Sequence, residues 1–147
     1  MAGFERFVRD ARPRLARAYL AGHGVEGSAD ATAEALAWAW EHWDQIQAMD
    51  NPIGYLYRVG QSKQRVRKTP RLPAPAALGL PDVEPDLIPA LLELPLRQRT
   101  VVWLVHGCQW QYREVGEALG ISASAVGTHV TRALEHLRAR LEVDADV

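Results

Sequence analysis

Basic side chains gather in one acid-free stretch of this sequence. Between Asn51 and Pro81 there is no aspartate or glutamate, although the whole chain has a formal net charge of −1. The basic residues of the stretch are Arg58, Lys63, Arg65, Arg67, Lys68 and Arg71. Concentrated cations bind phosphates. We therefore interpret the stretch as a nucleic-acid-binding surface rather than an ordinary solvated helix face.

A second polar set lies near the carboxyl end, where one helical face is apolar. The apolar stripe recurs at spacings of three and four, as Val126, Val130, Ala133, Leu134, Leu137 and Leu141. The opposite face carries Ser124, Thr128, Thr131, Arg132 and Arg138. Hydroxyl and guanidinium groups in this pattern suit the base edges and phosphates of a DNA major groove.

Residues 112–137, YREVGEALGISASAVGTHVTRALEHL, predict a helix-turn-helix. The first helix would cover Tyr112–Leu119 and the second would begin at Ala123. Gly116 leaves room where the helices cross, and Gly120 can adopt the positive φ that ends the first helix. Ser122 is a good N-cap for the second. The alternative is an ordinary helical hairpin with a glycine turn, because short motifs also occur by chance.

The rest of the chain has helical periodicity and no strand pattern. The expected helices are Phe4–Ala21, Ala29–Ile46, Ile53 to about Lys68, Leu87–Leu94, Leu96–Val105 and, after the turn, Ala123 to about Leu141. We expect turns at residues 22–24 and 27–28, and Pro13 to kink or divide the first helix. Asn51 and Pro52 are typical of an N-cap and a first helical residue. At least two of Trp38, Trp40 and Trp43 should be mainly buried.

A proline-rich segment separates two helical regions. Thr69–Asp86 holds five prolines in eighteen residues, which neither a helix nor a central strand tolerates. We interpret it as an extended linker. The predicted fold is therefore all-α, with a helical domain over residues 1–68, a linker over 69–86 and a helix-turn-helix domain over 87–147.

The residues favour neither catalysis nor metal binding. The five histidines show no ligand spacing, and the single cysteine, Cys108, excludes an internal disulfide and fits an ordinary buried thiol. There is no glycine-rich phosphate loop and no triad-like cluster. We expect no enzyme activity, no catalytic residue, no metal and no cofactor.

The amino-terminal residues, MAGFERFVRDARPR, carry charge throughout, unlike a signal peptide. No apolar run approaches the roughly 20 residues of a membrane span. We expect a cytoplasmic protein with no membrane partner.

The order of these parts resembles the sigma-70 family of RNA polymerase sigma factors, in its extracytoplasmic-function type. Residues 94–99, LPLRQR, resemble the entry to the family's region 4, and residues 132–138, RALEHLR, resemble its end. In region 2, residues 29–43 resemble the helix that docks on polymerase, and residues 51–59, NPIGYLYRV, resemble the start of the helix that reads the −10 element. The resemblance covers nearly the whole chain.

The resemblance implies three groups of site residues. Those for the −35 element are Ser124, Gly127, Thr128, Thr131, Arg132 and Arg138, with Arg97 and Arg99 on the backbone. Those for the −10 element are Tyr55, Tyr57, Arg58, Ser62, Lys63, Arg65, Arg67 and Lys68. Those for polymerase are Asp30, Glu34 and Trp38. The chain departs from the family's usual residues at Ala33, Ser62, Gly127 and His129.

The resemblance also implies partners and a function. The chain would bind core RNA polymerase at the β′ clamp helices and β flap, direct it to promoter DNA, and be open to control by an anti-sigma factor. The alternatives are a sigma-like DNA-binding regulator that acts without polymerase, an adaptor that binds polymerase but not promoter DNA, and, least favoured, an enzyme.

Overall fold

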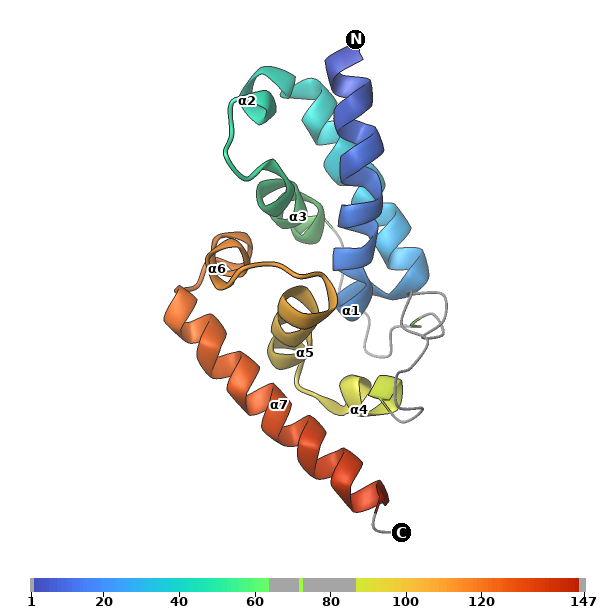
Figure 1. Ribbon diagram of the computed structural model, residues 1–147. Coiled ribbons are helices and arrows are strands. Elements are labelled where there is room, and N and C mark those ends of the chain that lie inside the picture. Colours follow the sequence, from blue (N-terminus) through green and yellow to red (C-terminus); the bar gives the residue numbers. More distant parts are fainter. Residues whose placement is uncertain (1, 64–71, 73–86, 146–147) are drawn as a thin grey trace.

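The computed structural model describes residues 2–63, 72 and 87–145, with side chains up to Glu142. Every regular element in these ranges is helical (Figure 1). The expected end of the third helix and the proline-rich linker fall outside the described residues, apart from Leu72. So do three of the predicted DNA-binding residues, Arg65, Arg67 and Lys68.

The first element, α1 (Ala2–Glu41), has two arms that meet at Gly24, whose φ of 72° and ψ of −174° are not helical. The arms lie side by side (Figure 1), with Phe4 in ring contact with Trp40 at 5.0 Å. The Ser28 hydroxyl also donates to the carbonyl of Ala16 in the opposite arm. The turn expected at residues 22–24 is confirmed, whereas residues 27–28 are helical and Pro13 does not divide the first arm.

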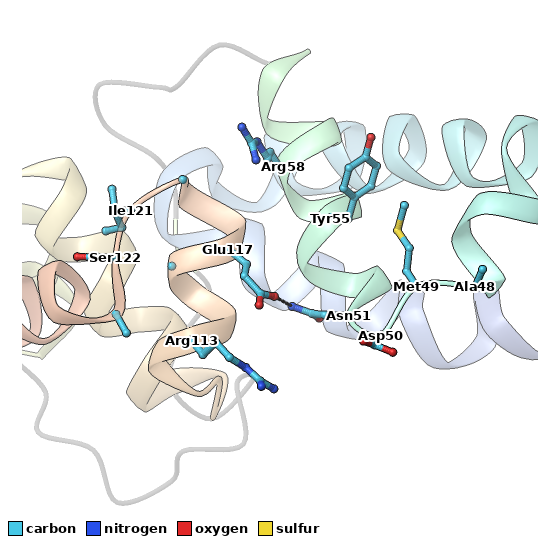
Figure 2. Close-up of a pocket in the computed structure, with 13 residues that line it drawn as sticks. Ala48, Met49, Asp50, Asn51, Tyr55, Arg58, Arg113, Glu117, Ile121 and Ser122 are labelled. Atoms are coloured by element: carbon cyan, nitrogen blue, oxygen red, sulfur yellow. Dashed lines mark hydrogen bonds between the residues drawn. The ribbon is translucent and has the colours of Figure 1, made fainter.

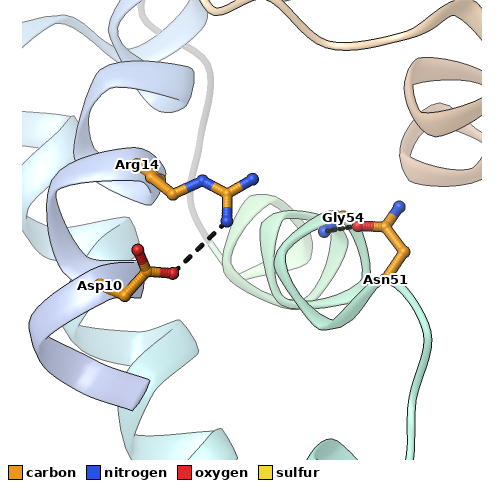
Figure 3. A network of polar contacts seen from close by, with 4 residues as sticks. All are labelled: Asp10, Arg14, Asn51 and Gly54. Atoms are coloured by element: carbon orange, nitrogen blue, oxygen red, sulfur yellow. Dashed lines mark hydrogen bonds and ion pairs between the residues drawn. The ribbon is translucent and has the colours of Figure 1, made fainter. Parts of the chain in front are cut away.

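The second arm ends earlier than expected, and the chain breaks at His42 before the short α2 (Trp43–Gln47). Helix α3 (Pro52–Ser62) begins as predicted: Asn51 is its N-cap, and its Oδ1 accepts from the amide of Gly54 at 3.2 Å (Figure 3). Figure 3 also shows the Asp10–Arg14 ion pair of α1, at 3.5 Å. Both partners are exposed, so this pair adds little stability.

The carboxyl-terminal half contains α4 (Leu87–Glu93), α5 (Leu96–Val102), the π-helical turn η2 (Trp103–Gly107), α6 (Tyr112–Leu119) and α7 (Ala123–Ala145). The helix expected over Leu96–Val105 therefore changes to wider π geometry at Trp103. In that turn, the amide of Cys108 donates to the carbonyl of Trp103, five residues earlier, at 2.9 Å.

The helix-turn-helix is confirmed with its predicted boundaries. Gly120 has a φ of 71° and ends α6, and the Ser122 hydroxyl accepts from the amide of Ala125 at 3.0 Å. A Cβ on Gly116 would lie 2.6 Å from the carbonyl oxygen of Ile121, so the glycine is required by the close crossing. One further cap was missed: the Glu114 carboxylate accepts from the amide of Gln111 at 2.9 Å.

The two halves pack on each other through one continuous hydrophobic core. It unites Leu15, Tyr19 and Leu56 of the first half with Leu104 and Val115 of the second. Helix α3 faces α6 across the middle of the molecule (Figure 1). A second, smaller cluster joins α4 and α5 to α7, and its buried members are Ala90, Leu91, Leu94, Val102, Ala133 and Leu137.

Polar contacts reinforce the junction between the halves. The Trp103 indole N–H donates to the carbonyl of Arg17 at 2.8 Å, and the Arg17 Nε donates to the carbonyl of Gly107 at 3.1 Å. Asn51 Nδ2 donates to Glu117 Oε2 at 3.2 Å. The halves that the linker separates in sequence are therefore in direct contact in this arrangement.

Gly116→Ala should lower the free energy of unfolding by about 1–3 kcal/mol, because a backbone oxygen blocks the new methyl group. Denaturant unfolding followed by circular dichroism would measure the change. Gly3→Ala is the matched control, since its Cβ would meet only Trp43 at 3.8 Å. Equal stability of the two variants would contradict the crossing geometry.

Cys108 should react slowly with alkylating reagents in the native chain. Burial raises the pKa of its thiol to about 12, against the opposing effect of Arg17. At pH 8 the thiolate fraction is then roughly a thousandfold lower than in the unfolded chain. Trp103→Phe removes one hydrogen bond between the halves, about 1 kcal/mol, and should speed labelling through the opened state roughly fivefold. An alkylation rate of Cys108 in the native chain equal to its rate in urea would contradict the burial of this thiol.

Candidate nucleic-acid interface

The exposed face of α7 and the start of α6 form a groove of about 550 Å³. Its lining residues are Tyr112, Ser124, Gly127, Thr128, Thr131, Arg132 and Glu135. Five of them were predicted for the −35 element, and the structure brings these five together. Arg138, also predicted, is exposed further along the same helix.

The two threonine hydroxyl groups of this groove are arranged as acceptors. Thr128 Oγ1 donates to the carbonyl of Ser124 at 3.2 Å, and Thr131 Oγ1 donates to the carbonyl of Gly127 at 3.0 Å. Each hydroxyl thus uses its hydrogen within the helix and keeps lone pairs toward the groove. Amino groups of cytosine and adenine are the base-edge donors that such oxygens can accept from.

Tyr112 and Glu135 were missed by the sequence analysis. A Cβ on Gly127 would lie 3.3 Å from Cε2 of Tyr112, so the tyrosine ring lies against α7 at this glycine. This contact gives a physical reason for a glycine in a helix that would otherwise carry a longer side chain. The sequence signal that could have identified Tyr112 is its pairing, as an aromatic residue at the start of one helix, with Gly127 in the next helix.

The two arginines at the start of α5 differ in exposure. Arg97 is exposed, whereas Arg99 is 5% exposed. Arg99 Nη1 donates to the carbonyl of Leu92 at 3.3 Å, and its buried Nε has no hydrogen-bond partner among the described residues. Burial lowers the pKa of this guanidinium. In this arrangement Arg99 cannot reach DNA, contrary to its expected role, because it fills the space between α4 and α5.

Helix α3 presents the predicted −10 residues on one side only. Tyr55, Arg58, Ser62 and Lys63 are exposed. Tyr57 is 2% exposed, with its ring stacked on Tyr19 at 4.8 Å and edge-on to Trp110 at 5.6 Å. Burial raises the pKa of its phenol above the usual range, while Arg97 acts the other way. In this arrangement Tyr57 belongs to the junction of the halves and cannot stack on a base.

A wider groove of about 900 Å³ separates α3 from the helix-turn-helix (Figure 2). One wall carries Tyr55 and Arg58, and the other carries Arg113. The Asn51–Glu117 hydrogen bond crosses between the walls. The groove therefore lies between the two surfaces predicted to contact DNA.

The residues predicted for polymerase docking follow one face of the second arm of α1. Asp30 and Glu34 are exposed and Trp38 is partly buried. The spacing of four places them in a row along the helix. The expectation that at least two of the three tryptophans are mainly buried is confirmed: Trp38 and Trp43 are mostly covered and pack against the core, whereas Trp40 is 54% exposed. Phe4 of the opposite arm contacts the rings of Trp40 and Trp43, and Phe7 contacts Trp43.

Within the described ranges, no group of three or more histidine, cysteine, aspartate or glutamate residues is placed to hold a metal ion. Over the same residues, no helix has the length and apolar character needed to cross a membrane. The arrangement offers binding surfaces, with most of its charged groups, though not Arg99, on exposed helix faces.

Comparison with known proteins agrees with this geometry. A family model described as Sigma-70, region 4 matches residues 86–137. The RNA polymerase sigma-E factor of Streptomyces avermitilis is 32% identical over 156 residues, which cover 95% of this chain and 85% of that protein.

Two solved structures share the fold. The sigma factor RpoE from Bartonella quintana, in complex with the anti-sigma factor NepR, has a TM-score of 0.76 at 19% identity, covering 98% of this chain and 99% of that one. CnrH, in complex with the cytosolic domain of CnrY, has a TM-score of 0.72 at 26% identity, covering 96% and 88%. With the helix-turn-helix in place and a sigma factor as a relative over nearly its whole length, this chain belongs to the sigma-70 family of RNA polymerase sigma factors, in its extracytoplasmic-function type.

Proposed function

We propose that the chain binds core RNA polymerase and directs it to specific promoters. The observation that supports the proposal is that one sigma-family chain carries two separate exposed sets of polar and basic side chains, one on α7 and one on α3. Such a protein makes and breaks no bonds. Its contribution is to place polymerase by phosphate contacts and to choose the site by base contacts.

The −35 element would occupy the groove on α7. Ser124, Thr128 and Thr131 lie where base edges would be read, and Arg132 and Arg138 lie where phosphates would pass. Arg97 is exposed at the start of α5 and is available for a further backbone contact. Arg99 could join it only after α4 and α5 rearrange.

The −10 element would lie along the exposed side of α3. Arg58 and Lys63 would neutralise phosphates, Ser62 would add a hydrogen bond, and Tyr55 would stack on a base. Arg65, Arg67 and Lys68 are proposed to extend this surface on sequence grounds alone. Tyr57 would be available only if α3 separated from Trp110.

Core polymerase would dock on the second arm of α1 through Asp30, Glu34 and the edge of Trp38, against the β′ clamp helices. The second half would meet the β flap. Because the solved relatives are complexes with the anti-sigma factor NepR and with CnrY, a protein of the same kind is the regulator we propose for this chain.

The division into residues 1–68, 69–86 and 87–147 also belongs to this proposal. Eighteen linker residues can extend to at most about 60 Å, which allows the halves to part and reach two separate promoter elements. Parting them would expose the shared core, so polymerase and DNA must supply the compensating contacts.

Run-off transcription on fragmented genomic DNA, with core polymerase and with or without the chain, tests the function. We expect discrete new transcripts whose upstream regions share two elements. Duplex binding by the chain alone, without transcripts, would instead support the regulator that acts without polymerase.

Arg132→Ala should weaken promoter binding and reduce the slope of log K against log salt by about 0.9, the effect of one lost phosphate contact. Filter binding or fluorescence anisotropy over a salt series would measure the slope. Arg12→Ala, which removes an exposed arginine from the first arm of α1, is the matched control. The same slope for Arg132→Ala and wild type would remove Arg132 from the phosphate contacts.

A further inference from the structure

Three aromatic rings meet where the second arm of α1 approaches α3. The Trp38 indole and the His42 imidazole are stacked, with centroids 3.9 Å apart and an interplanar angle of 12°. The Tyr55 ring lies 5.3 Å from Trp38 at 50°. Trp38 was assigned to polymerase and Tyr55 to DNA, and His42 was assigned to neither.

His42 is held in one orientation. Its Nδ1 lies 2.9 Å from the carbonyl oxygen of Trp38, and because a carbonyl only accepts, Nδ1 carries the proton and donates. The residue also stands at the break between α1 and α2, with a φ of −123°. The imidazole therefore covers the indole from a fixed position, and the indole in turn supports Tyr55.

Tyr55 is the exposed member of the group, with 40% of its surface accessible. Tyr55 and Arg58 are both exposed and, being three residues apart, are neighbours on the surface of α3. Figure 2 shows the Met49 side chain beside the tyrosine. All three line the wide groove between α3 and the helix-turn-helix. A flat apolar ring next to a cation matches a nucleotide, whose base stacks and whose phosphate is negative.

We propose that His42 and Trp38 are positioning residues that hold Tyr55 as a stacking platform for one unpaired base of the opened −10 strand. The inference rests on the proposed function and extends it to a residue, His42, outside the −10 helix. An exposed tyrosine loses rotamer freedom when a base binds, and a ring that already packs on Trp38 loses less. Arg58 then takes the adjacent phosphate.

The test uses the full-length chain with core polymerase and a fork-junction DNA. The DNA is built from a promoter recovered by run-off transcription, with its −10 non-template strand unpaired and 2-aminopurine placed at one position at a time. Stacking on Tyr55 should quench the probe at one position. Tyr55→Ala should abolish that quenching and weaken fork binding about 5- to 150-fold.

His42→Ala should reduce the quenching at that same position and weaken fork binding about 2- to 10-fold, the range of one aromatic pair. His42→Phe, which keeps a ring over Trp38, should retain most of the quenching. Affinity for a duplex carrying only the −35 element should not change, because that surface lies on α7 and contains neither Trp38 nor Tyr55. His106→Ala, which removes an exposed imidazole from η2, is the matched control.

Wild-type quenching in His42→Ala would overturn the proposal. So would an equal loss of core-polymerase and −35 binding, since that result would make His42 a general structural residue. A wild-type chain that forms no promoter complex with core polymerase would overturn the proposed function itself, a failure that is seen before any variant is made.

Discussion

Arg17 and Trp103 form the contact on which the arrangement of the two halves depends. Two hydrogen bonds join the halves here. The Trp103 indole N–H donates to the carbonyl of Arg17, and the Arg17 Nε donates to the carbonyl of Gly107 at the end of η2. The guanidinium carbon also lies 5.3 Å from the centre of the Trp103 ring, a cation–π geometry. These polar groups are paired where the shared core would otherwise leave them unsatisfied, so the core can close around them.

The closed core leaves one of the two surfaces proposed to contact DNA fully open and covers part of the other. The groove on α7 points away from the junction and keeps its predicted residues exposed. Helix α3 lies against α6, so one of its sides, with Tyr57, is buried against Trp110. Contact with the −10 strand through Tyr57 therefore requires the junction to open, whereas contact through Tyr55 and Arg58 does not.

Aromatic residues lie at both of the binding surfaces that we propose for the first half. The acids proposed for polymerase docking follow one row of α1, and Trp38 stands at the edge of that row, turned to Tyr55. Trp38 therefore lies next to both proposed surfaces, the one for polymerase and the one for DNA. The helix that we propose receives polymerase thus also supports the ring that we propose receives a base, and His42 fixes the indole between them.

The sequence by itself determined the features that are decided within a few residues. Asn51 and Ser122 cap the helices they were expected to cap, and Gly120 ends α6 with positive φ. A cap needs only a side-chain oxygen and an amide three residues away, so no distant partner is involved. The all-α fold and the family followed from the same local patterns. The π-helical turn and the break at His42 did not, because neither has a local signal in these residues.

Only the tertiary structure decided which tyrosine of α3 and which arginine of α5 is exposed. Tyr55 and Tyr57 are two residues apart, as are Arg97 and Arg99, so each pair lies about 200° apart around its helix. The sequence placed all four at the DNA, yet Tyr57 and Arg99 are buried. Helical spacing says that the members of a pair face opposite ways. Which side is covered depends on a neighbour distant in the chain: Trp110 for Tyr57, and the carbonyl of Leu92 in α4 for Arg99.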